Sequence, residues 1–511
     1  MDIRKDSDIK VSDVMKNHSF KPSNSSKKVL SNSAIYAVSG ILQKCFSFFL
    51  LPLYTSFLST EDYGITNVAS GFLNTMSFIV SLSLYSAVMR FYVDYKNDGE
   101  KLKRFYGTVI TFVFISSVFF ICVLSIAHTA LSTYVFKGID FFPKIAICLL
   151  SLGFFCQHEI YDSILRSQQK AVKCSVLTIL YFLITVSCNI LFVVHYKMGA
   201  NGVLLSTLIS TFLYTCYFLI DIFIKKSVTI CIDIKLLKEA LRYSIPIIPH
   251  NLSTKFVELF SIVLIGGTKS LGVVGIYSIA AQFGGISDAL QNYVNQAYTP
   301  WLFDQLKCHN DGFRETISRV ARVLRLLFGF IFVCIGLFSQ DYIFIFLDKS
   351  YMDAWHYVPL VVIVYSIKIP YYFYVSMLLY YKQASKKLFI ATVSGSLVNV
   401  LLSAFAIPRW GAYGSIAADA VAMVIRVAIV YCIGSRYENI GLYLKDFVKS
   451  FCLILVVMTI GLLPSYYNNL QAFSISNFLY KTIIVLVCFV CLYAFNRKEI
   501  KRILDSYKHK G

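Results

Sequence analysis

Apolar residues in this chain come in blocks of roughly 20, separated by short charged stretches or by glycine, proline and asparagine. A helix of about 20 apolar residues is long enough to cross the hydrocarbon core of a bilayer. Strand-like alternation is not sustained anywhere in the sequence, so the pattern predicts an all-α polytopic membrane protein. About fourteen transmembrane helices are expected, near residues 32–57, 65–89, 105–127, 142–165, 172–196, 202–224, 243–267, 275–300, 322–347, 357–381, 388–408, 412–434, 449–465 and 476–496.

The composition also indicates a membrane protein. Of the 511 residues, 57% are hydrophobic and only 15% are charged, and the mean hydropathy is +0.65. A soluble domain has about 45–50% apolar and about 25% charged residues. A single core cannot bury this much apolar surface, so lipid must be the solvent for much of the chain.

The net charge of +20 would suggest a nucleic-acid partner in a soluble protein, but its distribution follows membrane topology instead. If the N-terminus is cytoplasmic, the two termini and the inner loops hold 37 lysine and arginine residues. The outer loops hold only five: Lys137, Lys197, Lys269, Lys349 and Arg409. Cytoplasmic loops of membrane proteins are enriched in basic residues. Both termini are therefore predicted to be cytoplasmic, and no nucleic acid is expected as a partner.

Signatures of enzymes and of cofactor or metal sites are missing from the sequence. Walker A, HExxH and GxSxG motifs are absent, and no outer loop exceeds about a dozen residues. Cys488 and Cys491 form a CxxC pair inside an apolar segment without a second pair, so we interpret the cysteines as small, lipid-compatible residues. The first 30 residues are polar and unlike a cleavable signal peptide. A transporter is expected, not an enzyme, with no cofactor and no metal.

An internal repeat relates the two halves of the chain. Three pairs of residues recur at offsets between 210 and 212: Gly64 and Gly275, Asn189 and Asn399, and Gly199 and Gly411. Parallel repeats of this kind build transporters that rock around a central cavity. The expected domains are a disordered basic cytoplasmic tail (1–30), a first six-helix bundle (31–224), a cytoplasmic linker (225–242), a second six-helix bundle (243–434), two additional transmembrane helices (435–496) and a basic cytoplasmic tail (497–511).

Two lysines within predicted spans follow the same repeat. Lys44 lies near the middle of the first span, and Lys255 lies 211 residues later near the middle of the seventh. An ionisable group at mid-bilayer costs about 2.5–3.5 kcal/mol and usually faces a cavity or a partner. We expect the two ammonium groups to face each other across a central cleft, with a phosphate or diphosphate between them. The alternative is that they snorkel or pair locally with acids.

Acidic residues in the second half are candidates for ion coupling. Glu258 follows Lys255 by three residues on the same helical face, so it is expected to pair with Lys255, and proton exchange is the alternative. Asp288 follows Gly284 and Gly285 in the middle of the eighth span, where a kink is expected. Either a cavity or helix packing accounts for its position.

Further charged residues lie in or beside other spans. Asp419 and Arg426 share a face of the twelfth span, and Lys368 lies within the tenth. A cluster of these three residues is one interpretation, and polar contacts between helices are the equal alternative.

Two more candidates lie toward the cytoplasmic side of the first half. Asp162 and Arg166 are four residues apart on the fourth span, where an ion pair is the simpler interpretation and a coupling site the alternative. Arg90 ends the second span and is interpreted as a membrane anchor, or as a guide for an anionic head group.

Three stretches resemble a known family. Leu51–Ile65 (LPLYTSFLSTEDYGI) resembles the first-helix signature of polysaccharide-export flippases, as do Ser83–Tyr92 (SLYSAVMRFY) and Val274–Ala280 (VGIYSIA). Ser83 stands where the family often has glycine. By these motifs the chain is similar to oligosaccharide flippases of the multidrug/oligosaccharidyl-lipid/polysaccharide exporter superfamily.

The resemblance implies two bundles of six helices plus two further helices around an amphipathic cleft. It implies a bacterial inner-membrane protein that flips an undecaprenyl-diphosphate-linked oligosaccharide, an O-antigen or capsule repeat unit, by alternating access. Ion coupling, membrane lipids and a polysaccharide polymerase as a candidate partner belong to the same expectation. The diphosphate is expected near Lys44 and Lys255, with Arg90, Lys368 and Arg426 as further cationic candidates. The sugars are expected against polar side chains such as Gln282, Asn292 and Asn295.

Three other functions compete with this prediction. A lipid II flippase would look much the same in sequence. A cation-coupled multidrug exporter should have an acidic cavity, which the basic residues within the spans argue against. A membrane polysaccharide polymerase would need a sizeable catalytic loop on the outer face, and none is present.

Overall fold

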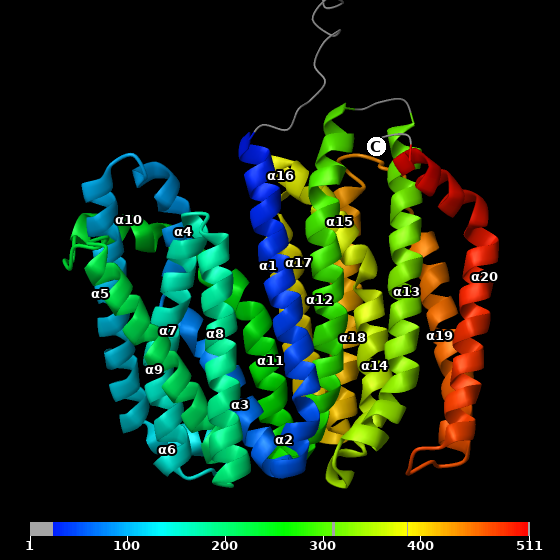
Figure 1. Ribbon diagram of the computed structural model, residues 1–511, viewed down its shortest axis with the longest axis horizontal. Coiled ribbons are helices and arrows are strands. Elements are labelled where there is room, and N and C mark those ends of the chain that lie inside the picture. Colours follow the sequence, from blue (N-terminus) through cyan, green and yellow to red (C-terminus); the bar gives the residue numbers. More distant parts are fainter. Residues whose placement is uncertain (1–23, 309–311, 386, 509–511) are drawn as a thin grey trace, which may run out of the picture.

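The computed structural model describes residues 24–308, 312–385 and 387–508, which form helices and connecting turns without a strand (Figure 1). Most of the predicted disordered tail, residues 1–30, and the last residues of the C-terminal tail, 509–511, lie outside this range. The helices are α1 (Asn24–Phe49), α2 (Leu51–Phe57), α3 (Thr60–Val80), α4 (Leu84–Tyr95), α5 (Gly99–Ile126), α6 (His128–Ala130), α7 (Ala146–Ser167), α8 (Ala171–Asn189), α9 (Ala200–Ile224), α10 (Ile234–Ser244), α11 (Ile248–Thr268), α12 (Leu271–Cys308), α13 (Phe313–Phe346), α14 (Ala354–Ile367), α15 (Ile369–Tyr380), α16 (Lys382–Ser385), α17 (Leu388–Trp410), α18 (Ala412–Gly434), α19 (Leu444–Tyr467) and α20 (Ile475–Lys508). Short π-helical or 3-10 turns are η1 (Leu131–Val135), η2 (Phe141–Ile145), η3 (Ile190–His195), η4 (Ile245–Ile247) and η5 (Lys349–Tyr351).

The predicted polytopic membrane protein is confirmed. Within the described residues, 12 helices are long and apolar enough to cross a membrane, and 13 are if α3 and α4 count as one bent span. The seventh predicted span, residues 243–267, corresponds to α11, which is 21 residues long but does not reach the apolarity of the others. His250, Lys255 and Glu258 within α11 account for this difference.

The bend between α3 and α4 measures 48° and has a local cause. Leu82 and Ser83 have φ values of 47° and 52°, in the left-handed region that most residues avoid. Glycine enters this region without a steric penalty. The position at which Ser83 departs from the flippase signature is therefore one where glycine would suit the backbone.

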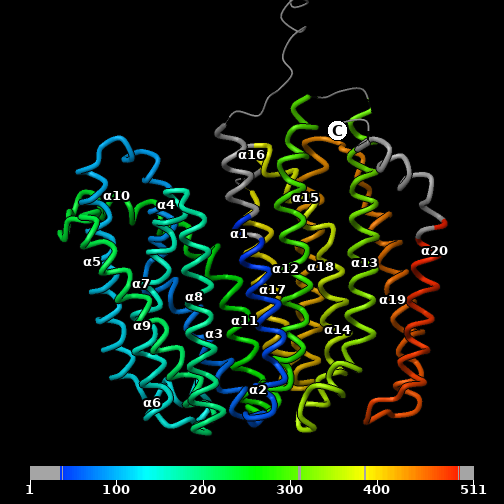
Figure 2. The backbone as a smooth tube through the Cα atoms, in the orientation of Figure 1, coloured from blue at the N-terminus to red at the C-terminus, as the bar shows by residue number. Residues whose placement is uncertain are grey.

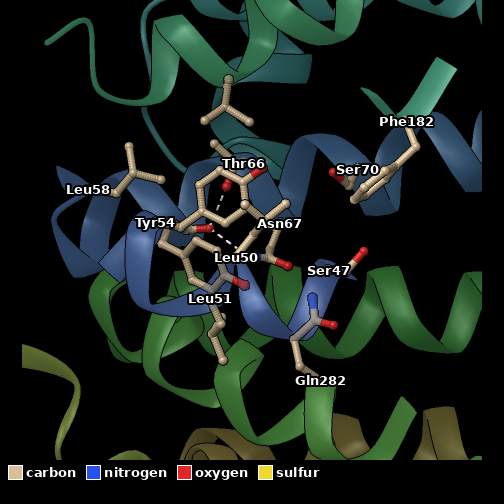
Figure 3. A pocket seen from close by; sticks show the side chains of 12 residues that line it. Ser47, Leu50, Leu51, Tyr54, Leu58, Thr66, Asn67, Ser70, Phe182 and Gln282 are labelled. Atoms are coloured by element: carbon tan, nitrogen blue, oxygen red, sulfur yellow. Dashed lines mark hydrogen bonds between the residues drawn. The ribbon is translucent and has the colours of Figure 1, made fainter. Parts of the chain in front are cut away.

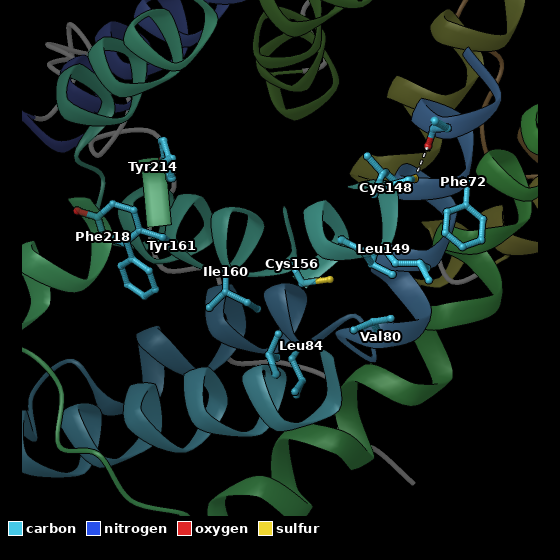
Figure 4. Packing of buried hydrophobic residues seen from close by; sticks show 14 of the residues in the cluster. Phe72, Val80, Leu84, Cys148, Leu149, Cys156, Ile160, Tyr161, Tyr214 and Phe218 are labelled. Carbon is cyan, nitrogen blue, oxygen red and sulfur yellow. Dashed lines mark hydrogen bonds between the residues drawn. The ribbon is translucent and has the colours of Figure 1, made fainter. Parts of the chain in front are cut away.

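Buried apolar side chains form two large clusters, one in each half of the chain. The first draws mainly on helices α3 to α9 and the second mainly on α12 to α18. Figure 4 shows the first cluster, in which Cys156 and Ile160 of α7 lie near Leu84 of α4 and Val80 of α3. Cys156 is fully buried among apolar neighbours, in agreement with its interpretation as a small core residue. The two clusters support two lobes, whose exact boundaries stay a prediction.

The internal repeat has counterparts in the packing of the helices. In the first half α1 packs on α8 and α12, and in the second half α11 packs on α17 and α3. Gly199 and Gly411 have nearly the same backbone angles, φ 56° and ψ −136° against φ 57° and ψ −132°. Only glycine adopts this conformation readily. Equivalent glycines therefore make equivalent turns in the two halves.

The lobes touch where Gly64 of α3 meets Gly275 of α12. A Cβ atom on Gly64 would lie 2.0 Å from the carbonyl oxygen of Leu271, and a Cβ atom on Gly275 would lie 2.0 Å from that of Thr60. Thr60 and Leu271 are separated by the same 211 residues as the two glycines, so the contact is pseudo-symmetric. Small residues allow membrane helices to approach this closely. We call this contact the glycine crossing.

Tyrosine hydroxyls join the lobes beside the glycine crossing. Tyr351 of η5 donates its hydroxyl proton between the carbonyl oxygens of Leu58 and Ser59, at 2.9 and 2.8 Å. Tyr342 of α13 donates to the carbonyl oxygen of Phe48 at 3.1 Å, and the two rings stack at 4.5 Å. These contacts lie at the end of the molecule that contains α2, at the bottom of Figure 1. The lobes are therefore joined at this end.

Helices α19 and α20 lie at one edge of the second lobe (Figure 2) and are held to α13 by a buried polar cluster. The side chain of Lys481 is 0% exposed and its ammonium lies 2.8 Å from the carboxylate of Asp341, which is 5% exposed. Lys481 and Ser465 both donate to Oε1 of Gln340, at 2.7 and 2.6 Å. Asn477 donates to Ser465 at 3.1 Å. We call these five residues the Lys481 cluster; none of them was predicted from the sequence as a site residue.

Candidate functional site

A cavity of about 200 Å³ lies where the two lobes meet, at the junction of α1 and α2 (Figure 3). Its walls come from α1, α2, α3, α8 and α9 of the first half and from α12 of the second. We call it the α1–α2 pocket, and it is lined by Ser47, Leu50, Leu51, Tyr54, Leu58, Tyr63, Thr66, Asn67, Ser70, Phe182, Val203 and Gln282. The expected polar residue Gln282 is therefore part of a cavity.

The polar groups of the α1–α2 pocket are amides and hydroxyls held by neighbouring helices. Asn67 donates to the carbonyl oxygen of Tyr63 at 2.7 Å, which leaves its side-chain oxygen as an acceptor. The Tyr54 hydroxyl accepts from Asn189 at 2.9 Å and keeps its own proton to donate. Gln282 reaches into the pocket from the opposite lobe. The pocket therefore offers both donors and acceptors to a ligand.

Lys44 lies on α1 one helical turn before Ser47, which lines the pocket. The Lys44 residue is exposed, and the described part of the chain gives it no ion pair. This face of α1 points toward α12, because a Cβ atom on Gly40 would lie 2.2 Å from the hydroxyl of Tyr293. Lys44 is thus a free ammonium beside the pocket.

Lys255, the repeat counterpart of Lys44, has a different environment. Its ammonium lies 2.9 Å from the carboxylate of Glu258, and the two side chains are 40% and 57% exposed. The pairing predicted from their spacing is confirmed. The backbone carbonyl of Lys255 also accepts from Thr75 of α3 at 3.1 Å, which ties α11 to the first lobe. The two lysines are equivalent in sequence, but only Lys255 carries its own counterion.

Asp288 and Lys368 form an interhelical ion pair in the second lobe. Lys368 lies at the break between α14 and α15, and its ammonium is 2.5 Å from Asp288 of α12. Tyr372 donates to the same carboxylate oxygen at 3.0 Å. The side chains of Lys368 and Asp288 are 18% and 35% exposed. Asp288 is thus held by two donors from the opposite helix.

Asp419 and Arg426 have other partners. Asn399 of α17 donates to Asp419 at 2.6 Å, and Arg426 donates to Ser396 of α17 at 2.8 Å. The predicted cluster of Asp419, Lys368 and Arg426 is therefore replaced by separate groupings. The reason is that Asp288 lies on α12 opposite Lys368 and pairs with it. The separation of the two residues in the sequence does not predict this pair.

The fourth span carries a buried polar group in the first lobe. Asp162 accepts from Tyr214 of α9 at 2.5 Å and lies 3.5 Å from Arg166, which confirms the predicted i,i+4 pair. The ring of His158 packs against Tyr214 with centroids 3.9 Å apart, and neither of its nitrogens has a hydrogen-bond partner within the described residues. In the sequence, the only sign that His158 belongs to this polar group is that it lies four residues before Asp162, on the same face of the helix.

The remaining candidates lie outside the pocket. Arg90 is exposed and pairs with Asp94 at 2.8 Å on the same helix, as a local surface pair. Asn292 is exposed on α12, and Asn295 accepts from Ser376 at 2.7 Å. Of the three polar residues predicted to contact sugars, only Gln282 lines the α1–α2 pocket.

The Asp288–Lys368 pair gives a first testable prediction. We expect Asp288→Asn to lower the thermal stability of the purified chain, because Lys368 would keep its charge without a counterion. Combining Asp288→Asn with Lys368→Met should recover part of the loss, with a coupling energy of about 0.5–3 kcal/mol in a double-mutant cycle. Additive effects of the two substitutions would contradict an energetic link between them.

Comparisons with known proteins bear on the family and the fold of the chain. A family profile described as polysaccharide biosynthesis protein matches residues 29–305, more than half of the chain. No curated protein sequence matches the chain.

Several solved structures share the fold. The lipid II flippase MurJ in an inward closed conformation matches with a TM-score of 0.65 at 16% identity, over 92% of this chain and 99% of that one. An inward-facing multidrug resistance MATE transporter of the MOP superfamily matches with a TM-score of 0.61 at 14% identity, over 77% and 94%. A MOP superfamily transporter from Pyrococcus furiosus, described by the reverse polarity of its binding pocket, matches with a TM-score of 0.52 at 15% identity, over 79% and 95%. At these identities the likeness establishes the fold alone. By its family match, the chain belongs to the polysaccharide biosynthesis protein family.

Proposed function

We propose that this chain flips an undecaprenyl-diphosphate-linked oligosaccharide, an O-antigen or capsule repeat unit, across the bacterial inner membrane by alternating access. The family match supports a role in polysaccharide biosynthesis, and the fold supports a transporter. The observation that carries the proposal is Lys44, an ammonium without an ion-pair partner among the described residues, on a membrane helix beside a polar cavity between the lobes.

An unpaired ammonium within a membrane helix is costly and is retained for a reason. A diphosphate crossing the hydrocarbon needs positively charged side chains that neutralise it, and lysine binds phosphate as a point charge. Lys44 from one half and Lys255 from the other would supply these charges, and Lys368 and Arg426 are further cations of the second lobe. Arg90 is exposed in the middle of α4, where it pairs with Asp94, and would act only before entry.

Carboxylates near these cations suit an ion-coupled cycle. Glu258 neutralises Lys255 in this structure, so a diphosphate arriving at Lys255 would compete with Glu258 and free its carboxylate to bind a proton or cation. Asp288, Asp419 and Asp162 are further candidates, since each lies on a membrane helix with a partner on another helix. Substrate movement and ion movement would thus share the same side chains.

Orientation follows from the distribution of basic residues. The positive-inside rule places the N-terminal end of α1, at the top of Figure 1, in the cytoplasm. The glycine crossing and the bonds of Tyr351 then close the outer end of the protein. The conformation described would be the inward state of the cycle.

A lipid II flippase is the main competing function, because MurJ shares the fold over nearly its whole length. Both functions handle a polyprenyl diphosphate, so the sugar separates them. A cation-coupled multidrug exporter has less support, because the free charge beside the pocket is a cation.

Genetic complementation tests the proposal. We expect the chain to restore surface polysaccharide in a bacterium that lacks its O-antigen flippase and supplies the chain's native glycan. Lys44→Ala and Lys255→Ala should each lower export by about tenfold, since a charge-assisted hydrogen bond contributes roughly 1.5–3 kcal/mol. Surface polysaccharide is measured by gel staining at equal protein abundance.

The matched control is Lys449→Ala, which removes an exposed lysine from α19, away from the pocket. Unchanged export from both the Lys44 and Lys255 variants would refute the assigned diphosphate site. Rescue of a strain depleted of its lipid II flippase, without restored surface polysaccharide, would favour the competing function.

A further inference from the structure

The α1–α2 pocket differs from its surroundings in carrying no charged side chain. The 12 lining residues include two amides and several hydroxyls, together with aromatic and aliphatic groups, but no carboxylate, ammonium or guanidinium (Figure 3). Charged candidates lie nearby on the same helices, with Lys44 one turn away on α1 and Asp288 two turns away from Gln282 on α12. The pocket is therefore an uncharged compartment within a charged site.

An uncharged compartment selects among ligands by the cost of desolvation. A phosphate or carboxylate placed there would lose water without gaining a counterion, which is strongly unfavourable. A sugar ring loses less, because its hydroxyls donate and accept hydrogen bonds and its C–H faces pack on apolar side chains. Phe182 and Tyr54 offer such surfaces in this pocket.

The free hydrogen-bonding groups suit sugar hydroxyls. Asn67 uses one amide proton on the Tyr63 carbonyl and presents its side-chain oxygen as an acceptor, whereas the Tyr54 hydroxyl accepts a hydrogen bond from Asn189 and presents its own proton as a donor. Gln282 interacts with the Tyr63 hydroxyl and contributes the remaining groups of its amide from the second lobe. Hydroxyl groups can satisfy both kinds of partner, and a carboxylate can satisfy only the donors.

The size of the pocket limits what can enter. Its volume of about 200 Å³ lies below the roughly 300–1,000 Å³ of pockets that hold drug-sized ligands. This is room for one sugar residue and not for a repeat unit of several. The rest of the glycan must lie elsewhere in the transport path.

We propose that the α1–α2 pocket binds a single uncharged sugar of the transported lipid-linked oligosaccharide and rejects a uronic acid at that position. The inference rests on the proposed flippase function and adds a charge selectivity to it. The diphosphate lies on the Lys44 side of the pocket, and the bound sugar lies between it and the glycine crossing. The neutral sugar therefore precedes the diphosphate toward the outer end of the protein.

Binding of three short-chain probes to the purified full-length chain tests the inference. The probes are citronellyl diphosphate, the same diphosphate joined to N-acetylglucosamine, and the same diphosphate joined to glucuronic acid. We expect N-acetylglucosamine to tighten binding about tenfold over citronellyl diphosphate alone, as two neutral hydrogen bonds would. Glucuronic acid should bring no gain.

Substitutions in the pocket should act on the sugar alone. Asn67→Leu and Gln282→Leu should each reduce the gain from N-acetylglucosamine to less than about threefold, with unchanged affinity for citronellyl diphosphate. Asn292→Leu, an exposed position on α12 outside the pocket, should leave all three affinities unchanged. Gln282→Lys should reverse the preference, so that the glucuronic acid probe binds more tightly than the N-acetylglucosamine probe.

The outcomes separate this inference from the proposed function. If the wild-type chain binds none of the three probes, the proposed flippase function fails. If it binds citronellyl diphosphate but glucuronic acid tightens binding as much as N-acetylglucosamine, the selectivity is wrong. If Gln282→Lys binds citronellyl diphosphate normally and does not reverse the preference, the pocket is not where the sugar binds.

Discussion

Replacing Gly64 or Gly275 by leucine should reduce polysaccharide export to background while the protein remains in the membrane. Even a single Cβ atom at either position would lie 2.0 Å from a backbone carbonyl of the opposite helix. That oxygen belongs to the first turn of a helix and cannot rotate away, so α3 and α12 would have to separate. Overpacking of this kind typically costs about 1–3 kcal/mol, and the cost falls only on the conformation in which the lobes touch. The substituted protein would therefore lose the closed state that the alternating-access cycle requires.

Export in the complementation strain and the thermal stability of the purified chain are the two measurements for this prediction. Gly285→Leu is the matched control, because it lies on α12 and nothing is within 4 Å of a Cβ atom there. We expect this control to export within about twofold of the wild type, as a glycine-to-leucine change at an open helix position should do. Normal export from the Gly64 and Gly275 variants would show that the glycine crossing is not used during transport.

Helix positions could be predicted from the sequence because each span carries its own hydrophobic signal. Fourteen apolar blocks correspond to helices or helix pairs in the structure, including the broken spans α3–α4 and α14–α15. The repeat was also visible in sequence, since Gly199 and Gly411 need the same backbone conformation and Gly64 and Gly275 the same close approach. Features that depend on one residue or one helix are thus readable from sequence.

Pairs between helices were harder to predict. Glu258 and Arg166 were matched with partners on their own helices, because i,i+3 and i,i+4 spacing fixes proximity. Lys368 was grouped with Asp419 but binds Asp288, 80 residues away in sequence. Tertiary packing decides which of several membrane helices faces Lys368, and this packing cannot be predicted from amino-acid composition.

The pocket itself could be predicted only in part. Gln282 was among the polar residues expected to contact sugars, but Asn67 and Ser47 were not singled out, since neither side chain is ionisable. The pocket forms because α1 breaks into α2 at Leu50 and the two lobes meet at this level. Neither event leaves a pattern in the sequence that differs from an ordinary helix end.

Removing the charge of Lys481 should have the largest effect on stability of any single substitution considered for this chain. Lys481→Met would leave the Asp341 carboxylate 5% exposed between α13, α19 and α20 without its counterion. Breaking a buried ion pair by removing one partner costs about 3–5 kcal/mol. It would also leave Oε1 of Gln340 with Ser465 as its main donor. We therefore expect a large decrease in the unfolding temperature of the purified full-length chain.

A double substitution distinguishes the ion pair from simple packing. Combining Lys481→Met with Asp341→Leu removes both charges and should recover most of the lost stability, because a buried ion pair can be replaced by apolar residues at little cost. The matched control is Lys103→Met, which breaks an exposed pair with Glu100 and should cost less than about 1 kcal/mol. If the double variant is less stable than Lys481→Met alone, the Lys481 cluster stabilises the protein through shape and not through charge. Recovery of stability together with full export would show that α19 and α20 need only to be held against α13, and that the buried charges take no part in moving the substrate.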